Sequence, residues 1–353
     1  MYEKLLSKAQ LLVAFALPLA GCSSDDAGPK TDAQYEHEVT RGMHDSLLAD
    51  IKALHQAAIR IGKAAPEHAW DVDADADAIA GMTQAWLDAR AAYERTEGAL
   101  APLFPHIDGA IDARYDDFLA DLGEEGDQNL FDGEGVTGMH AIERILFVDS
   151  TPKSVVTLES SLPGYKAAAW PETDEEALDF KQELCATLVA DTARLENEWT
   201  PQDIDLDGAY GGLISLMNEQ REKVSKAASE EEESRYAQRT MADIRDNLAG
   251  TIKIYDLFRP WLHSKDGGIA IDDDVQAAFD SLDAAYSAVT GDAIPQPPDD
   301  WSSEKPSEKD LATPFGELYT AVQGSVDPNV AGSAVDGMNR AAAKLGFEEF
   351  VEE

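Results

Sequence analysis

The chain has 353 residues, of which 69 are Asp or Glu and 28 are Lys or Arg, so its net charge at neutral pH is −41. A field of this sign excludes binding to nucleic acid or to an anionic surface through overall charge, and it attracts cations. The chain has only two cysteines, Cys22 and Cys185, which excludes a scaffold held together by several disulfides.

The first 21 residues predict an export signal. Two lysines precede an apolar run, Leu11–Leu19, which is too short to cross a bilayer as a helix. The run leads into Ala20-Gly21-Cys22, the pattern at which bacterial lipoproteins are cleaved and acylated. We therefore predict a signal peptide over residues 1–21, a lipid on Cys22 and a flexible tether over residues 22–35.

The residue after the acylated cysteine indicates where the lipoprotein is sorted. Ser23 follows Cys22, and a residue other than Asp at this position is typical of lipoproteins in the outer membrane. We expect a cell-envelope protein in that membrane, facing the periplasm. With Cys22 acylated, Cys185 has no partner for an intramolecular disulfide, and its apolar helical surroundings predict a buried small hydrophobe.

The rest of the chain predicts an all-α fold without a significant β-sheet. It is rich in Ala, Leu, Glu and Asp, and long stretches show helical periodicity. We expect two packed helical bundles, over about residues 36–165 and 172–353. The predicted helices are Asp32–Ala65, Asp75–Leu100, Ile111–Leu122, Val136–Phe147, Glu172–Trp199, Tyr210–Ala228, Glu230–Leu262, Asp272–Thr290, Thr313–Val326 and Asn329–Leu345.

Two of these helices carry charged residues on their apolar faces. On the second predicted helix, Arg90 and Glu97 fall within the apolar stripe, and Glu94 lies beside it. On the fourth, Glu143 falls within the stripe and His140 at its edge. Burying a lone carboxylate is costly, so such residues are normally paired with a cation or bound to a metal.

The spacing of these residues suggests a metal site. Glu94 and Glu97 are three residues apart, as are His140 and Glu143, so each pair lies on one helix face about one turn apart. Helical bundles build metal sites from such pairs on facing helices. A buried Arg90–Glu97 ion pair beside a hydrogen-bonded core histidine is the alternative, and the pattern alone leaves both interpretations open.

The segment Gly138-Met139-His140-Ala141-Ile142-Glu143 matches the G-x-H-x-x-E signature of the imelysin family, which includes EfeO-type periplasmic iron-uptake proteins. Three further segments resemble the family in the same order, so that the resemblance covers about residues 40–262. They are Trp86-x-x-x-Arg90-x-x-Tyr93-Glu94-x-x-Glu97, Ile107 to Arg114, and Tyr236 with Ile254 to Pro260.

The resemblance implies an all-helical double bundle with a periplasmic metal site. Its implied ligands are His140, Glu143, Glu94, Glu97 and Asp112. Four more residues would orient those ligands, namely Arg90, Arg114, Asp108 and Tyr93. EfeO-type proteins often carry an N-terminal cupredoxin domain, and we expect none here because the predicted tether leads directly into the helices.

The leading functional hypothesis is a membrane-anchored metal-binding protein that assists iron uptake. Histidine with carboxylates also suits zinc and copper. The expected partners are the metal ion, the membrane through Cys22 and an iron-transport protein, with no nucleic acid. The family also carries a peptidase label, but the zincin motif H-E-x-x-H is absent, since Ala141 and Arg144 stand where it needs Glu and His. A third hypothesis is a polysaccharide- or ligand-binding module that uses the six tryptophans.

Overall fold

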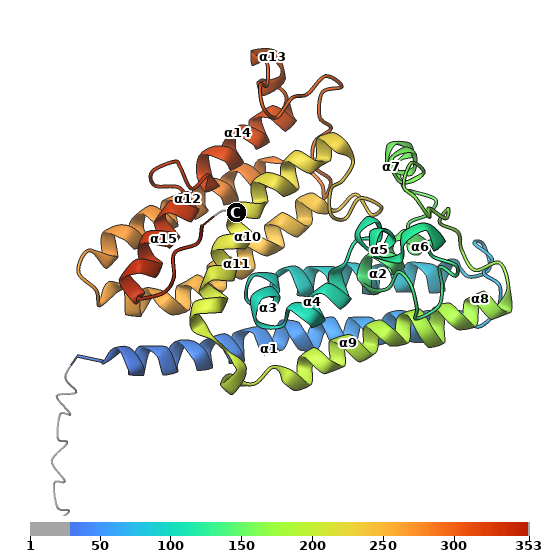
Figure 1. Ribbon diagram of the computed structural model, residues 1–353, viewed down its shortest axis with the longest axis horizontal. Helices are drawn as coiled ribbons and strands as arrows, with labels where there is room; N and C mark the ends of the chain where they lie inside the picture. The colour runs from blue at the N-terminus through green and yellow to red at the C-terminus, as the bar shows by residue number, and fades with distance from the viewer. Residues whose placement is uncertain (1–28, 352–353) are drawn as a thin grey trace, which may run out of the picture. The chain divides into compact units, whose positions relative to one another are not determined.

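The computed structural model describes residues 29–351, and this part of the chain is helical, with no β-strand (Figure 1). The all-α prediction is therefore confirmed. The predicted signal peptide, Cys22 and the start of the tether lie outside the described residues, and the first helix already begins at Asp32. Within the described residues, no helix combines the length and the apolarity that a bilayer crossing requires.

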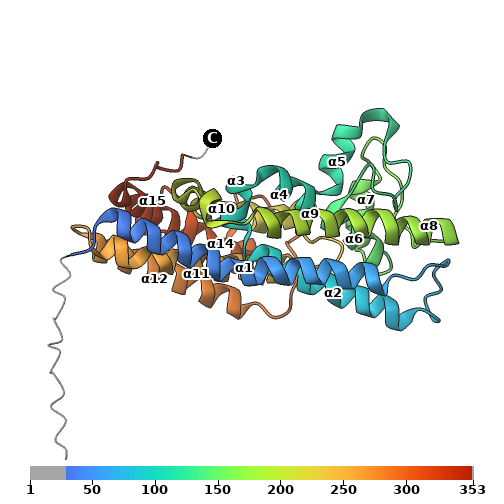
Figure 2. The same ribbon diagram turned by 90° about the horizontal axis from the view of Figure 1, so that it is seen from below.

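Three long helices form one layer of the N-terminal bundle. They are α1 (Asp32–Ala64), α2 (Ala76–Glu94) and α9 (Cys185–Glu198), and α2 and α9 both lie along α1 (Figure 2). One face of α1 is buried at intervals of three or four residues, so the helix packs through a continuous apolar stripe. This stripe comprises Val39, Met43, Leu47, Ile51, Leu54, Ala58 and Ile61.

The helix predicted over Glu172–Trp199 forms as one run with an irregular turn inside it. Its parts are α8 (Asp174–Asp179), a π-helical turn (Phe180–Leu184) and α9. The sequence division assigns this segment to the second bundle, whereas α9 packs on α1 and on short helices of the N-terminal bundle. Cys185 at the start of α9 is buried, and burial raises the pKa of its thiol.

Short helices pack on this layer of the N-terminal bundle and connect its long helices. They are α3 (Glu97–Leu103), α4 (Pro105–Asp112), α5 (Tyr115–Leu122), α6 (Gly138–Leu146) and α7 (Lys153–Glu159), with a 3₁₀ turn at Gly123–Glu125. The continuous helix predicted over Asp75–Leu100 is wrong at Arg95 and Thr96, where the chain turns from α2 into α3. The helix predicted over Ile111–Leu122 is likewise interrupted, between α4 and α5.

The C-terminal bundle packs around an aromatic core. It contains α10 (Leu206–Lys226), α11 (Thr240–His263), α12 (Gly268–Ala288), α14 (Pro314–Val326) and α15 (Ala334–Leu345), with the short α13 (Glu308–Leu311) at its edge. Two 3₁₀ turns, Pro201–Asp203 and Ala227–Ser229, flank α10. Ring contacts join α10, α11, α12 and the C-terminal segment through Tyr210, Tyr255, Phe258, Trp261, Phe279 and Phe347.

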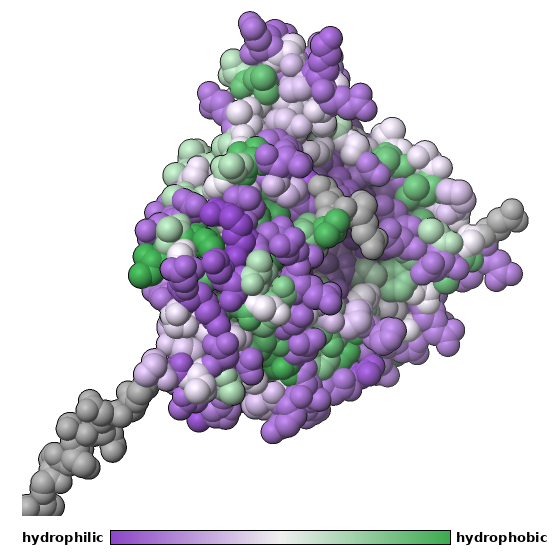
Figure 3. All heavy atoms as spheres, turned by 60° about the vertical axis from the view of Figure 1, so that its left-hand side comes forward, coloured by the Kyte–Doolittle hydropathy of each residue, from purple (hydrophilic) through white to green (hydrophobic). Residues whose placement is uncertain are grey.

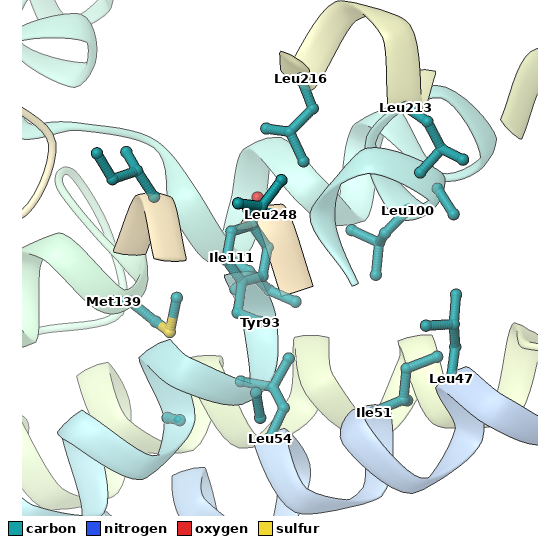
Figure 4. Packing of buried hydrophobic residues seen from close by; sticks show 14 of the residues in the cluster. Leu47, Ile51, Leu54, Tyr93, Leu100, Ile111, Met139, Leu213, Leu216 and Leu248 are labelled. Atoms are coloured by element: carbon teal, nitrogen blue, oxygen red, sulfur yellow. The ribbon is translucent and has the colours of Figure 1, made fainter. Parts of the chain in front are cut away.

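The two bundles share one hydrophobic core. Figure 4 shows leucines of α10 facing the side chains that line the α2–α3 junction, with α1 on the opposite side. A Cβ added at Gly250 of α11 would overlap the carbonyl oxygen of Arg95, so glycine lets α11 lie directly against the turn between α2 and α3. The face drawn in Figure 3 is covered mainly by hydrophilic side chains, in keeping with the chain's strong negative charge.

The helix predicted over Glu230–Leu262 is wrong in its first third. Residues 230–239 form an irregular connection, and α11 begins at Thr240. Glu230 and Gln238 adopt positive φ angles of 62° and 53°, which no helix interior allows. This connection lies over the α2–α3 junction and supplies residues to the cluster described next.

Candidate metal centre

A buried cluster of charged residues lies where the α2–α3 junction meets α4, α6, α10 and α11. Glu94 is the last residue of α2 and Glu97 the first of α3. Asp108 and Asp112 lie one turn apart on α4, and His140 lies on α6. These short helices lie beside α2 in Figure 1, so the turns between them gather side chains that are distant in sequence.

The start of α6 explains how His140 approaches α4. Gly138 is the first residue of α6 and has a φ of +87°, a conformation that favours glycine. A Cβ at this position would lie 2.8 Å from the carbonyl oxygens of Ala110 and Ile111. The glycine therefore lets α6 begin directly on the backbone of α4, which brings His140 Nε2 to 3.4 Å from Asp112 Oδ1.

Three carboxylates form the centre of the cluster. Glu94, Glu97 and Glu233 each offer one oxygen atom, and the three atoms lie within 4.8 Å of one another. Glu94 and Glu97 are buried, and Glu233 reaches them from the connection before α11. The side-chain amide of Asn247 on α11 lies 2.5 Å from Glu94 Oε2 and 2.7 Å from Glu97 Oε2.

Two cations are inserted among the carboxylates. The buried guanidinium of Arg90 contacts Glu94 and Asp112, and it lies 3.2 Å from Glu233 and 3.5 Å from Asp243. The second cation is Lys223 on α10, whose ammonium lies closest to Glu233 among the carboxylates.

Glu143 contacts the imidazole of His140 on the side away from the cluster. The Nδ1 atom of His140 lies 2.7 Å from Glu143 Oε2, while Glu143 Oε1 accepts hydrogen bonds from the backbone N–H groups of Tyr236 and Ala237 at 3.2 and 2.8 Å. The carboxylate of Glu143 is thus fully used, and it orients the imidazole so that Nε2 faces the cluster. Nε2 is buried and makes no hydrogen bond of ordinary geometry, its nearest partner being Asp112.

Burial and mutual repulsion shift several pKa values in the cluster. Burial raises the pKa of Glu94 well above its usual range and that of Glu97 to about 7, although Arg90 and Lys223 oppose these shifts. Burial also raises the pKa of Asp108 to about 6, against the hydrogen bond from Tyr93. The cluster therefore tends to hold protons that a bound cation would release.

Other groups in the cluster stay ionised despite their burial. Burial opposes ionisation of Asp112, but Arg90 and His140 outweigh it and lower the pKa of that carboxyl. Burial likewise opposes ionisation of Glu233, and Lys223 and Arg90 overcome it to lower the pKa. Burial favours neutral His140, but Asp112 and Glu143 raise its pKa to about 9.

A pocket of about 440 Å³ connects the cluster to the surface. Asp108, Asp112, Lys223 and Glu233 line its inner wall, and its remaining wall includes Arg114, Asp117, Glu219, Glu222 and Lys226. The cluster is therefore buried but reachable, and the carboxylates along the pocket give an approaching cation a favourable path.

The resemblance of these segments to a known family is confirmed by comparison with known proteins. Residues 40–316 match the family model described as Imelysin. The chain belongs to the imelysin family. The match extends to residue 316, beyond the region of resemblance over residues 40–262, and both ranges include Lys223, Glu233 and Asn247 of the cluster.

Curated relatives match a shorter part of the chain. The iron uptake system component EfeO of Yersinia pseudotuberculosis is 28% identical over 195 residues, which cover 55% of this chain and 41% of that protein. An Efem/EfeO family lipoprotein of Staphylococcus aureus is 30% identical over 190 residues, covering 54% of this chain and 52% of that protein. The chain thus spans about half the length of these curated relatives.

The fold also has a solved counterpart. The crystal structure of an imelysin-like protein from Psychrobacter arcticum superimposes with a TM-score of 0.60 at 13% sequence identity, covering 92% of this chain and 99% of that one. At this identity the likeness shows a shared fold, which agrees with the family assignment.

In this imelysin-family chain, most of the predicted site residues lie together. Glu94, Glu97, Asp112 and His140 belong to the cluster, as do Arg90 and Asp108, and Tyr93 donates a hydrogen bond to Asp108 Oδ1 at 2.6 Å. Glu143 lies behind His140. Arg114 lies apart from them on the pocket wall, where its Nη1 donates to the carbonyl oxygen of Glu231 at 3.2 Å.

Four residues of the cluster were not predicted, namely Lys223, Glu233, Asp243 and Asn247. Asp243 and Asn247 share the buried face of α11 with Ile244 and Leu248. Polar residues within an apolar stripe are the same signal that identified Glu97, so analysis of this helix face would have found both. Glu233 offers no such signal, because its segment reads as helix and its position depends on contacts with distant residues.

Proposed function

We propose that this imelysin-family chain is a lipid-anchored protein of the cell envelope that binds a transition metal ion and assists iron uptake. The observation that carries the proposal is the trio of Glu94, Glu97 and Glu233, of which the first two are buried and the third half-buried, and one oxygen of each lies within 4.8 Å of the other two. Carboxylates at this separation repel unless a proton or a cation lies between them.

The donor set fits a transition metal as cargo. His140 Nε2 is buried without a hydrogen bond and lies 3.4 Å from Asp112 Oδ1. Carboxylate oxygens with one imidazole nitrogen suit iron and zinc, and the imidazole also suits copper. Iron comes first because relatives of this chain are named as an iron uptake system component and as EfeO-family lipoproteins.

The location follows from the amino-terminal sequence. We propose that a lipid on Cys22 holds the domain at the outer membrane with its pocket facing the periplasm, because the cleavage pattern is followed by Ser23. One relative is itself named a lipoprotein. In this position the protein would bind iron in the periplasm and pass it to a transport partner.

The decisive experiment measures metal binding by protein that begins after Cys22. Elemental analysis and anaerobic titration with Fe²⁺, Zn²⁺ and Cu²⁺ would compare the native sequence with His140→Ala and Glu97→Gln. We expect near-stoichiometric binding that both substitutions weaken at least tenfold. Asp117→Asn, which removes a charge from the outer pocket wall, is the matched control and retains binding. Absent binding, or binding that neither substitution at the cluster weakens, would refute the proposal.

The peptidase name of the family model calls for a separate assay. The same metal-loaded protein would be incubated with unfolded casein and the products followed by mass spectrometry. We expect casein to stay intact. Cleavage that His140→Ala abolishes would replace the uptake role with metallopeptidase activity at the same site.

A further inference from the structure

We propose that Lys223 is an internal counter-ion, occupying the metal position in the metal-free protein and moving into the pocket when an ion binds. This inference rests on the proposed metal-binding function and adds to it the means by which the site stays charge-balanced when empty.

The position of the ammonium group is the first argument. Lys223 Nζ lies 2.8 Å from Glu233 Oε2, 3.2 Å from Glu97 Oε2 and 3.9 Å from Glu94 Oε2. It thus lies within 4 Å of all three carboxylates whose oxygens cluster within 4.8 Å. A metal ion bonded to these oxygens at about 2.0–2.2 Å would occupy the same space, so the ion and the ammonium exclude each other.

A comparison with Arg90 shows why Lys223 is the group that moves. Arg90 is fully buried on α2, and its planar guanidinium is fixed by contacts with Glu94, Asp112, Glu233 and Asp243. Lys223 is 8% exposed, and its flexible side chain forms part of the pocket wall. It has a path outward that Arg90 lacks.

The pocket offers the displaced ammonium new partners. Glu219 and Glu222 lie on the same helix as Lys223 and line the same pocket. Glu219 precedes Lys223 by four residues, a spacing at which helical side chains of opposite charge meet. The lysine would therefore exchange the carboxylates of the trio for carboxylates at the pocket wall.

This exchange affects both binding and release. An incoming ion must compete with a resident positive charge, so its apparent affinity is lower than the carboxylates alone would give. When the ion leaves, the ammonium returns and restores the charge balance of the three carboxylates, of which only Glu94 and Glu233 also contact Arg90. A carrier that must give up its ion benefits from both effects.

The test compares two methionine substitutions on one helix. Lys223→Met removes the ammonium from the trio, whereas Lys226→Met removes the same charge from the wall of the same pocket, where Lys226 pairs with Glu222 at 2.5 Å. In anaerobic Fe²⁺ titrations, with Zn²⁺ as a redox-inert probe, we expect Lys223→Met to bind at least tenfold more tightly and to release the ion more slowly to a chelator. Lys226→Met should stay within about twofold of the native protein.

A second measurement on the native protein avoids any folding defect of the variant. Lysine acetylation by a water-soluble reagent, mapped by mass spectrometry, would be compared with and without Zn²⁺. Displacement predicts that Zn²⁺ increases acetylation of Lys223 several-fold, while acetylation of Lys226 changes little. Reduced or unchanged acetylation of Lys223 in metal-saturated protein would overturn the inference.

The outcomes separate this inference from the proposed function. If the native protein binds metal and Lys223→Met binds equally well, the counter-ion role is wrong and the metal site stands. If only Lys223→Met binds, the lysine does occupy the metal position, and the native chain is not a metal carrier. If neither protein binds either ion, both proposals fail.

Discussion

The side chain of Asn247 joins α11 to the end of α2 by donating to Glu94 Oε2 at 2.5 Å, and it lies 3.1 Å from the carbonyl oxygen of the same residue. The Oδ1 atom of Asn247 lies 3.0 Å from Lys223 Nζ. The amide thus supplies donors to the carboxylates on one side and an acceptor to the ammonium on the other, a combination that no carboxylate can provide.

Asn247→Asp should therefore destabilise the metal-free protein. The substitution keeps the shape of the side chain but places a further carboxylate against Glu94 and Glu97, and it removes their shared donor. We expect a loss of at least about 3 kcal/mol in the free energy of unfolding, since the added carboxylate repels Glu94 and Glu97 at a buried position where their shared donor is lost. Urea unfolding in the presence of a chelator measures this loss.

Asn218→Asp on α10 is the control for that experiment. It introduces the same charge at a half-buried position whose Oδ1 already accepts a hydrogen bond from Arg221 at 2.8 Å. It should change the unfolding free energy by less than about 1 kcal/mol. Equal effects of the two substitutions would mean that the amide of Asn247 has no special role in the cluster.

The sequence was sufficient to predict helices whose burial pattern is local and regular. The predicted Asp32–Ala65 differs from α1 by one residue, because this helix carries an uninterrupted apolar stripe and ends before Pro66. The sequence was not sufficient where tertiary contacts override the helix propensity of a segment. Residues 230–239 read as helix, yet in the structure the backbone N–H groups of Tyr236 and Ala237 donate to Glu143 instead of to a helical turn.

The residues of the candidate site could likewise be predicted only where the local helix pattern indicates their burial. Glu94, Glu97 and His140 could be predicted because they are polar residues on or beside the apolar face of a predicted helix, where side chains are buried. The turn between the end of α2 at Glu94 and the start of α3 at Glu97 could not be predicted from this pattern, although it changes how the two carboxylates are presented. Lys223 and Glu233 reach the cluster from the other half of the chain, and one sequence carries no information on contacts at that separation.

Gly138→Ala should damage both stability and the site. Alanine would be held at a φ near +87° with its Cβ against the carbonyl oxygens of Ala110 and Ile111, so α6 would have to move away from α4. We expect a loss of about 2 kcal/mol or more in the free energy of unfolding and weaker metal binding, because His140 moves with α6.

Gly109→Ala provides the contrast on the helix that faces Gly138. Gly109 lies within α4, and a Cβ there would meet no atom within 4 Å. Alanine should therefore be neutral or stabilising by up to about 1 kcal/mol, through its better helix propensity. Thermal unfolding of both variants checks the pair, and a Gly138→Ala protein as stable as the native one would contradict the packing described for α6.

Glu143→Gln should weaken metal binding while leaving the fold largely intact. Its carbonyl oxygen can still accept from Tyr236 and Ala237, but its amide would face His140 Nδ1 as a donor. In the neutral imidazole, the form that a metal requires, the proton would then lie on Nε2, the nitrogen that faces the cluster, and remove the lone pair that a metal needs. We expect affinity to fall about 10- to 100-fold.

Two measurements distinguish this indirect role from direct ligation. Nitrogen NMR of His140 above pH 9, where the imidazole is neutral, would report the change of tautomer, and metal titration would report the affinity. A shift of the proton to Nε2 together with a smaller loss of affinity than in Glu97→Gln supports the orienting role. Native-like binding with an altered tautomer would mean that His140 is not a ligand.

Asp127 should make the protein's stability depend on pH, away from the metal centre. The residue is buried, and burial raises the pKa of its carboxyl to about 6, from a usual value near 4. The folded state therefore binds the proton more tightly than the unfolded state does. The resulting contribution to stability is fully present below about pH 4 and is lost as the pH rises through 6.

Asp127→Asn removes this titration while its side-chain oxygen can still accept the hydrogen bond from the backbone N–H of Asn129. Urea unfolding of both proteins between pH 4 and pH 7 gives the difference in their unfolding free energies, in which the other titrating groups cancel. We expect the native protein to gain stability relative to the variant as the pH falls from 7 to 4. Curves that run parallel over this range would show that Asp127 titrates alike in the folded and unfolded chains.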